Sequence, residues 1–204
     1  RAYMSPLAGG SGEEAAAQPG YLRRLVAFVI LSAGTGGLGA SVASVLTLYM
    51  VDHFGASEQT AASLMAIYCS AGLWASPLGG HISDRLGRVP VIVVNSLIAA
   101  AAIYLLNIAS YGMGIFALIW IMGITTFVKL PVSESYIIGQ TTERNRSTVY
   151  GIYYFSMQES SAVLAPIMGL IIDRFGFYNG FTIASVAIVV VVLACSPFLR
   201  GSRE

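Results

Sequence analysis

The sequence has very little charge. Charged residues occupy 10% of its 204 positions, whereas hydrophobic residues occupy 56%. Soluble domains carry about a quarter of their residues as charges, so this composition excludes an ordinary water-soluble fold. The net charge is only +1, and the arginines lie between apolar runs instead of in one basic patch, which argues against a nucleic-acid partner. The composition indicates an integral membrane protein.

Cysteine and catalytic motifs are also scarce. Cys69 and Cys195 are the only cysteines, and both fall within apolar runs, where a thiol behaves as a small hydrophobic group. We therefore expect neither a disulfide nor a metal site. The sequence contains no HExxH or GxSxG pattern and no pair of aspartates inside the apolar runs. An enzyme would need such a constellation, so we expect no enzymatic activity and no cofactor.

Long apolar runs dominate the sequence, and each is close to or above the about 20 residues that a helix needs to cross a bilayer. Strands of a membrane barrel would be about half that length. Division of the chain at charges, glycine and proline predicts six helices, at residues 22–51, 58–82, 89–109, 112–140, 147–172 and 178–199. We thus expect an all-α integral membrane protein.

The flanking segments are polar. Residues 1–20 are rich in glycine, alanine, serine and glutamate and predict a flexible cytoplasmic linker, with further chain expected upstream of Arg1. A six-helix transmembrane bundle is expected at residues 21–200, and a cytoplasmic tail at residues 201–204.

The arginines predict the orientation. If the helices alternate in direction, every arginine except Arg174 falls on the face that holds both termini. The positive-inside rule then places both termini in the cytoplasm, and a plasma (inner) membrane location is expected. An odd number of helices would divide the arginines between the two faces, so their distribution also supports an even number.

An internal repeat links the two halves of the chain. Residues 77–87, PLGGHISDRLG, align without gaps on residues 166–176, PIMGLIIDRFG. The shift of 89 residues corresponds to three predicted helices, so the two copies fall on opposite faces. The pattern predicts two inverted three-helix repeats. The recurring residues are Pro77 and Pro166, Gly80 and Gly169, Ile82 and Ile171, Asp84 and Asp173, Arg85 and Arg174, and Gly87 and Gly176.

The repeated residues suit a sharp turn between helices. We expect Gly87 and Gly176 to adopt the left-handed backbone that ends a helix. Gly80 and Gly169 should let a neighbouring helix approach closely. Asp84 can accept hydrogen bonds from the positive end of an adjacent helix, whereas Arg85 and Arg88 can bind carboxylates or the phosphates of membrane lipid.

These residues resemble a known family. Gly80, Asp84, Arg85, Gly87 and Arg88 match the GxxxDRxGR signature that follows the second helix in each half of a major facilitator superfamily (MFS) transporter, although a basic residue usually stands where this chain has Val89. The stretches ERNRSTVYG and APIMGLIIDRFG resemble the two ends of the family's eleventh helix, and the predicted fourth helix lacks the arginine signature of an N-terminal half. The chain therefore resembles the C-terminal six-helix half.

The resemblance implies transport of a small solute by alternating access. It also implies that the first, second, fourth and fifth helices line a cavity while the third and sixth face lipid. A missing N-terminal half, or a second copy of this chain, would complete the carrier. The conserved turn of the family acts as a conformational latch, a role that would fall here to Gly80, Asp84, Arg85, Gly87 and Arg88 and to Gly169, Asp173, Arg174 and Gly176.

Two ionisable residues lie deep within predicted helices. Lys129 lies two residues before Pro131, and Glu159 lies about 18 Å from Ser147 along a helix. Such groups are costly in a bilayer and usually face a cavity or a partner, so each is a candidate partner for the other. Glu159 could exchange a proton or bind a cationic part of the solute, and Lys129 could balance it or bind an anionic part. A permanent ion pair, or a Lys129 side chain that extends to the interface, is the alternative.

Other polar residues extend this candidate pathway. Glu134 lies nearer the cytoplasmic end of its helix, and Tyr154, Gln158 and Ser161 recur at helical spacing, where they could bind a ligand or pack against another helix. A buried carboxylate can titrate, so proton-coupled secondary transport is the expected activity. The alternative is a six-helix membrane protein that is not a carrier, such as a sensor or scaffold.

Overall fold

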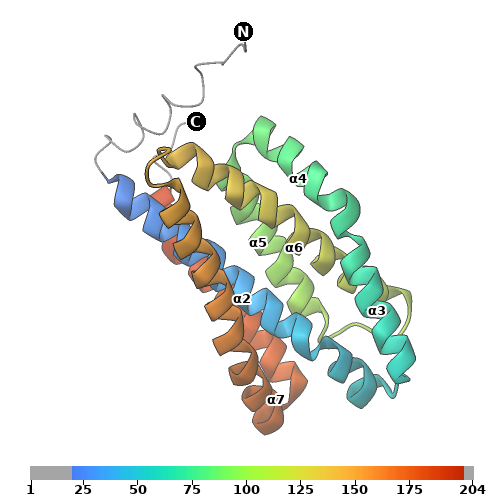
Figure 1. Ribbon diagram of the computed structural model, residues 1–204. Coiled ribbons are helices and arrows are strands. Elements are labelled where there is room, and N and C mark those ends of the chain that lie inside the picture. The colour runs from blue at the N-terminus through green and yellow to red at the C-terminus, as the bar shows by residue number, and fades with distance from the viewer. Residues whose placement is uncertain (1–19, 200–204) are drawn as a thin grey trace.

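The computed structural model describes residues 20–199, which form helices joined by turns and short loops. The predicted all-helical fold is confirmed (Figure 1). The predicted linker, apart from Gly20, and the predicted tail lie outside the described residues. The helices are α2 (Tyr21–Phe54), α3 (Glu58–Ser70), α4 (Gly72–Leu86), α5 (Arg88–Leu105), α6 (Met113–Gln140) and α7 (Arg146–Leu199).

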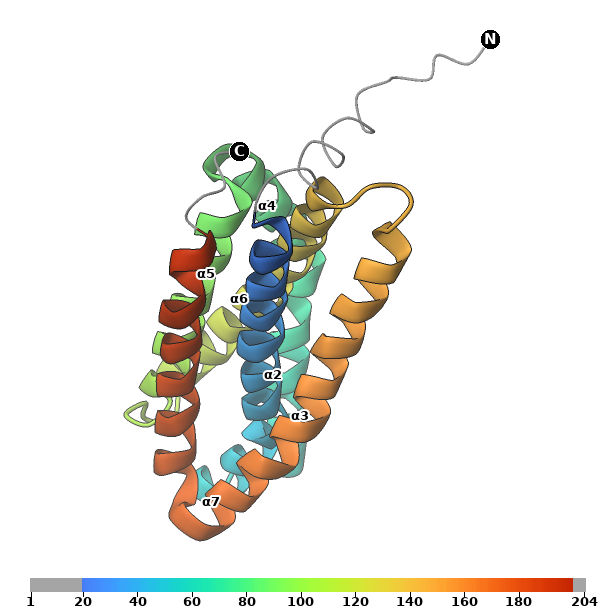
Figure 2. The same ribbon diagram turned by 90° about the vertical axis from the view of Figure 1, so that its left-hand side faces the viewer.

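Five of these stretches are long and apolar enough to cross a membrane: α2, the continuous pair α3 and α4, α5, α6 and α7. The sequence predicted six, and the difference lies in α7, which has 54 residues. A straight helix of that length would extend about 80 Å. Figure 2 shows instead that α7 folds back on itself, and Gly176 is the residue inside it with non-helical backbone angles, φ 80° and ψ 167°.

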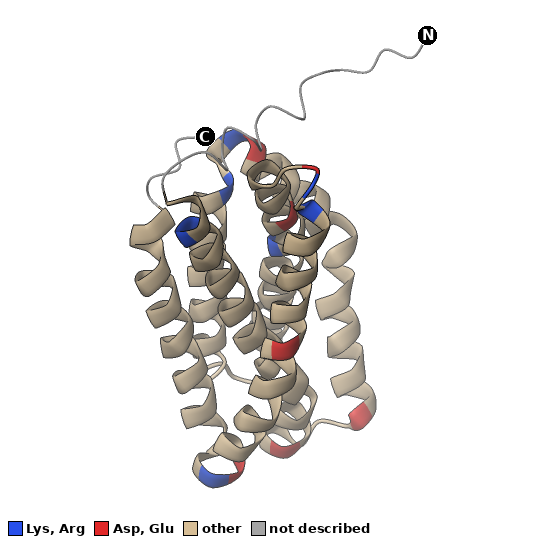
Figure 3. Ribbon diagram, turned by 60° about the vertical axis from the view of Figure 1, so that its left-hand side comes forward, with Lys and Arg blue, Asp and Glu red and all other residues tan. Residues whose placement is uncertain are grey.

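The beginning of α2 and the end of α7 lie side by side. The guanidinium carbon of Arg23 is 4.3 Å from the centre of the Phe198 ring, a distance suited to a cation–π contact. Basic residues gather at this end of the bundle in Figure 3, and the fold-back of α7 lies at the opposite end. The arginines, which are unevenly distributed along the sequence, therefore also gather at one end of the bundle.

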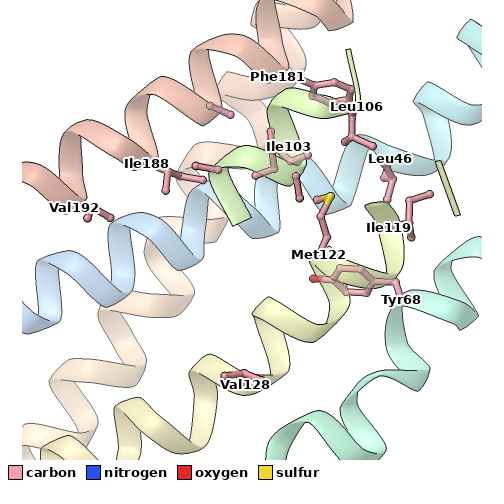
Figure 4. Close-up of a cluster of buried hydrophobic side chains, with 14 of the residues drawn as sticks. Leu46, Tyr68, Ile103, Leu106, Ile119, Met122, Val128, Phe181, Ile188 and Val192 are labelled. Carbon is pink, nitrogen blue, oxygen red and sulfur yellow. The ribbon is translucent and has the colours of Figure 1, made fainter. Parts of the chain in front are cut away.

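The hydrophobic core lies between α2, α5, α6 and α7. Figure 4 shows Leu46, Ile103, Ile119 and Phe181 converging from these four helices, and each is at most 1% exposed. Polar groups at the helix ends are satisfied within this packing. The hydroxyl of Tyr49, for example, donates to the carbonyl of Leu106 at 2.9 Å, where the end of α5 leaves a carbonyl without a partner in its own helix.

Glycines let neighbouring helices approach closely, but two of the glycines of the repeat, Gly80 and Gly169, are not among them. A side chain on Gly79 would place its Cβ 2.8 Å from a backbone oxygen of α6, and one on Gly37 would place it 2.7 Å from the Cβ of Ser160 in α7. Within the part of the chain that the structure describes, no neighbouring helix has an atom within 4 Å of a Cβ added at Gly80 or Gly169. The prediction that Gly80 and Gly169 permit close packing is therefore wrong within this chain, because these positions face away from its neighbouring helices.

Candidate functional site

Lys129 lies in α6 next to a missing backbone hydrogen bond of that helix. Pro131 has no backbone N–H, so the carbonyl of Phe127 lacks its usual partner four residues later. The hydroxyl of Ser76, in α4, donates to that carbonyl at 3.1 Å. Packing of α4 against α6 thus compensates for the proline, and the helix continues through the region that holds Lys129.

The Lys129 side chain is directed toward α2. Its Nζ donates to the backbone oxygen of Ser32 at 3.0 Å and to the hydroxyl of Thr35. Only 7% of Lys129 is exposed, so the side chain does not extend to the membrane interface. Lys129 is the only lysine in the sequence. The expected pairing with Glu159 is not present, since the ammonium group is bound by α2 instead.

Contacts between α2 and α6 lie on one side of Lys129, and a cavity lies beside it. Before it, the rings of Phe28 and Tyr136 stack with centroids 3.9 Å apart, and the hydroxyls of Ser32 and Ser133 are 3.5 Å apart. Beyond it, the helices enclose a cavity of about 150 Å³. Its polar lining comes from three helices and consists of Thr35, Asn95, Ser96, Thr125, Thr126 and Lys129.

Sequence reasoning missed the contribution of α5 to this cavity. The resemblance implied that this helix faces lipid, yet Asn95 and Ser96 are only 8% and 2% exposed and line the cavity. The side-chain nitrogen of Asn95 donates to the carbonyl of Thr125 at 2.7 Å, which ties α5 to α6. The signal was present, because Asn95 and Ser96 are adjacent polar residues inside an otherwise apolar run.

The polar residues of α7 form a second, more open group. Tyr154 donates to the carboxylate of Glu134, so the structure brings these two predicted residues together across α6 and α7. Gln158 and Glu159 are exposed, and Ser161 is half-buried. Within residues 20–199, the Glu159 carboxylate has neither a hydrogen bond nor an ion pair.

The two predicted turns share an unusual backbone. Gly87 has φ 86° and ψ 148°, and Gly176 has φ 80° and ψ 167°. The predicted positive φ is confirmed at both, with ψ extended rather than helical. Non-glycine residues essentially do not adopt this region. Each glycine follows an exposed aspartate and arginine of the repeat by two or three residues.

Four charged residues of these turns, Asp84, Arg85, Asp173 and Arg174, are exposed. Within residues 20–199 Asp84 is exposed and accepts no hydrogen bond from an adjacent helix, contrary to the prediction. Arg88 lies against α6, with Nη1 2.5 Å from the position of a Cβ on Gly139. A cation near the last turn of a helix is favourable because that end is electronegative. Among the described residues, no three His, Cys, Asp or Glu side chains are placed to hold a metal.

Known proteins similar to this chain are transporters. The chain is 24% identical over 166 residues to the uncharacterized MFS-type transporter YhjO of Bacillus subtilis, covering 81% of the chain and 41% of the relative. It is 24% identical over 150 residues to human monocarboxylate transporter 11, covering 74% of the chain and 32% of the relative. The chain thus spans about two-fifths or less of the length of these relatives. Their names agree with the expectation that the chain is not an enzyme.

Solved structures show the same fold. An auto-inhibited POT family peptide transporter matches with a TM-score of 0.78 and 15% identity over 89% of this chain and 38% of its own. The POT family transporter PepTSo matches with a TM-score of 0.75 and 19% identity over 86% of this chain and 37% of its own. The family model described as Major Facilitator Superfamily matches residues 26–204. The chain is therefore an integral membrane protein that belongs to the Major Facilitator Superfamily.

Proposed function

We propose that this chain is the C-terminal half of a carrier that moves a small solute by alternating access. The observation that carries the proposal is the matched backbone of Gly87 and Gly176, which are equivalent in the sequence repeat. The connection between α4 and α5 and the fold-back of α7 lie at opposite ends of the bundle (Figure 2). Two such turns are expected of two three-helix units related by inversion. On this interpretation α7 crosses the membrane twice, as residues 146–175 and 177–199, and the bundle has six crossings.

A second half is needed to cover the polar face of α7. Glu159 and Gln158 are exposed at a depth where lipid would surround them, and an acidic side chain at the centre of a bilayer costs at least about 2.5 kcal/mol. The open space beside Gly80 and Gly169 also offers room for another helix. An N-terminal six-helix half, or a second copy of this chain, would enclose these residues in a central pathway.

The orientation follows from charge. The arginine-rich end would lie in the cytoplasm, together with the linker of residues 1–20, the tail of residues 201–204 and both termini. A plasma (inner) membrane is the proposed location. The exposed Asp84 and Arg85, and their counterparts Asp173 and Arg174, would bind the other half in one of the two conformations and release it in the other.

Proton coupling is proposed at Glu159, the exposed carboxylate of the pathway. Gln158 and Ser161 lie on the same helix and would donate hydrogen bonds to the solute. Tyr154, whose hydroxyl hydrogen is donated to Glu134, would accept one. One relative is named for monocarboxylates and one structural neighbour for peptides. Those names differ, so the substrate class has to be inferred from the residues of this chain.

Alternating access can be tested without a known solute by labelling a single cysteine from each side of the membrane. In the full-length protein, Cys69 and Cys195 are replaced by serine, and a single cysteine is introduced by Gln158→Cys. Sealed vesicles are treated with a membrane-impermeant maleimide from each side in turn. We expect labelling from both sides. The control is Val186→Cys, whose parent side chain is 55% exposed on the apolar second part of α7 and should be labelled from neither side.

The same experiment separates the carrier from its rival. A sensor or scaffold has no reason to open to both sides, so Gln158→Cys would then react from one side or from neither. Either of those results would refute the proposed function, provided that the Val186→Cys control stays unlabelled and both variants elute as folded protein in size-exclusion chromatography.

A further inference from the structure

We propose that the cavity beside Lys129 binds the carboxylate of a small organic anion. The further claim that this anion is the transported solute rests on the proposed function, whereas binding at Lys129 does not. The inference is carried by three features: a buried cation without a counter-ion, an unpaired buried hydroxyl in the same cavity, and the size of the space.

The charge of Lys129 is not balanced within the described residues. The lysine lies about 24 Å from the first residue of α6 and about 16 Å from the last, which places it well inside the bilayer. Its two hydrogen-bond acceptors, the Ser32 carbonyl and the Thr35 hydroxyl, are both uncharged. Glu134 accepts a bond from Tyr154 instead. A buried charge normally requires a partner, so an anionic ligand would supply what the chain does not.

The cavity offers hydrogen-bond donors to such a ligand. An ammonium group has three N–H donors, and α2 uses two of those on Lys129. Ser96 is 2% exposed and lines the same cavity, and its hydroxyl has no hydrogen-bond partner among the described residues. The Thr35 hydroxyl is already committed, because it donates to the carbonyl of Leu31 at 2.6 Å. Lys129 thus keeps one N–H donor and Ser96 keeps its hydroxyl donor, and both residues line this cavity.

The lining selects against other occupants. No carboxylate lines the cavity, so a cationic ligand would meet only the positive charge of Lys129. A volume of about 150 Å³ is similar to that of a cavity that holds benzene. The space therefore suits the acidic end of an organic anion, such as a carboxylate on a small ring.

On the side of α7, the Met157 side chain lines the cavity. A Cβ on Gly36 would lie 3.0 Å from Cε of Met157 and 3.6 Å from Nζ of Lys129. The absence of a side chain at Gly36 thus leaves room for both groups. Methionine is flexible, and Met157 lies on the helix that carries the exposed Gln158. A ligand in the central pathway would reach Lys129 by displacing the Met157 side chain.

Binding is tested on the purified full-length protein by isothermal titration calorimetry with benzoate. Benzamide, the neutral analogue of similar shape, is the ligand control. We expect benzoate to bind and benzamide not to bind. Lys129→Met should abolish binding, and Ser96→Ala should weaken it about tenfold because a hydrogen bond to a charged group is lost. The matched control is Ser185→Ala, which removes another buried serine that lies outside the cavity and should leave the affinity unchanged.

A second readout needs no substitution. Lys129 in the native protein is methylated with formaldehyde and a mild reductant, and the rate is followed on its peptide by mass spectrometry. Benzoate should slow the reaction several-fold, and benzamide should not. This measurement, together with Ser96→Ala, keeps the test decisive if Lys129→Met does not fold.

Several results would overturn the inference: equal affinity for benzoate and benzamide, unchanged benzoate affinity after Lys129→Met or Ser96→Ala, or a methylation rate that benzoate does not alter. A Lys129 that never reacts would identify a sealed structural cation and would also overturn it. If benzoate binds but Gln158→Cys is labelled from one side only, the anion site stands and the carrier function fails. If labelling is two-sided and benzoate does not bind, the carrier stands with a solute of another class.

Discussion

Replacing Gly37 with alanine should destabilise the packing of α2 against α7. The added Cβ would lie 2.7 Å from the Cβ of Ser160 and 3.0 Å from its carbonyl carbon, whereas carbon atoms prefer about 3.5–4.0 Å. The second contact is with backbone, so no side-chain rotation relieves it and the two helices must separate. Overpacking of this kind costs about 1–3 kcal/mol of unfolding free energy.

Gly39→Ala is the matched control for this prediction. It lies two residues further along α2, and nothing is within 4 Å of the position of its Cβ. Alanine is a better helix former than glycine, so this variant should be neutral or more stable by up to about 1 kcal/mol. The assay is the melting temperature of each purified variant, followed by tryptophan fluorescence. In a domain of this size, each kcal/mol shifts the midpoint by about 2–4 °C.

The reasoning also predicts a partial rescue. Adding Ser160→Gly to Gly37→Ala removes the contact between the two Cβ atoms and leaves the backbone contact, so the double variant should be more stable than the sum of the single losses predicts, by at least about 0.5 kcal/mol. A melting temperature for Gly37→Ala equal to or above that of Gly39→Ala would refute the close crossing of α2 and α7.

Two further predictions use the same melting assay. Gly87→Ala and Gly176→Ala should each cost about 1–3 kcal/mol, because both backbones occupy a region that is essentially restricted to glycine; a loss at only one of them would show that the two turns are not equivalent. Glu134→Gln and Tyr154→Phe should each cost about 1 kcal/mol through the hydrogen bond that joins α6 to α7. The two losses should be less than additive in the double variant, and full additivity would contradict that bond.

Local sequence patterns were enough for the helical class and the turns. Hydrophobic runs of bilayer length specify membrane helices because the bilayer leaves the backbone no other way to satisfy its polar groups. The positive φ of Gly87 and Gly176 also followed from the sequence, since glycine after an aspartate and arginine at a helix end marks a position that other residues do not tolerate. For the same reason, the sequence predicted a turn between residues 172 and 178, and α7 folds back at Gly176.

The tertiary structure alone decided which groups face one another. The positions of Lys129 and Glu159 along their helices predicted that the two side chains pair. The rotation of α6 instead directs the lysine to Ser32 and Thr35. Depth along a helix fixes one coordinate of a side chain, and the direction in which it points depends on how neighbouring helices are rotated and spaced. Close packing was predicted at Gly80 but is found at Gly79. Neighbouring residues of a helix point about 100° apart, so the rotation of α4 decides which glycine faces α6.

The cavity shows this division most clearly. Its residues come from four helices that are far apart in the chain, and no periodicity within one helix reveals that Ser96 lines the same cavity as Lys129. The sequence by itself determined that a lone lysine is placed inside a membrane helix, which is costly and calls for a partner. Only the packing of α2, α5, α6 and α7 decided that this partner is no carboxylate of the described chain, because the packing sets which polar groups share the space around the ammonium.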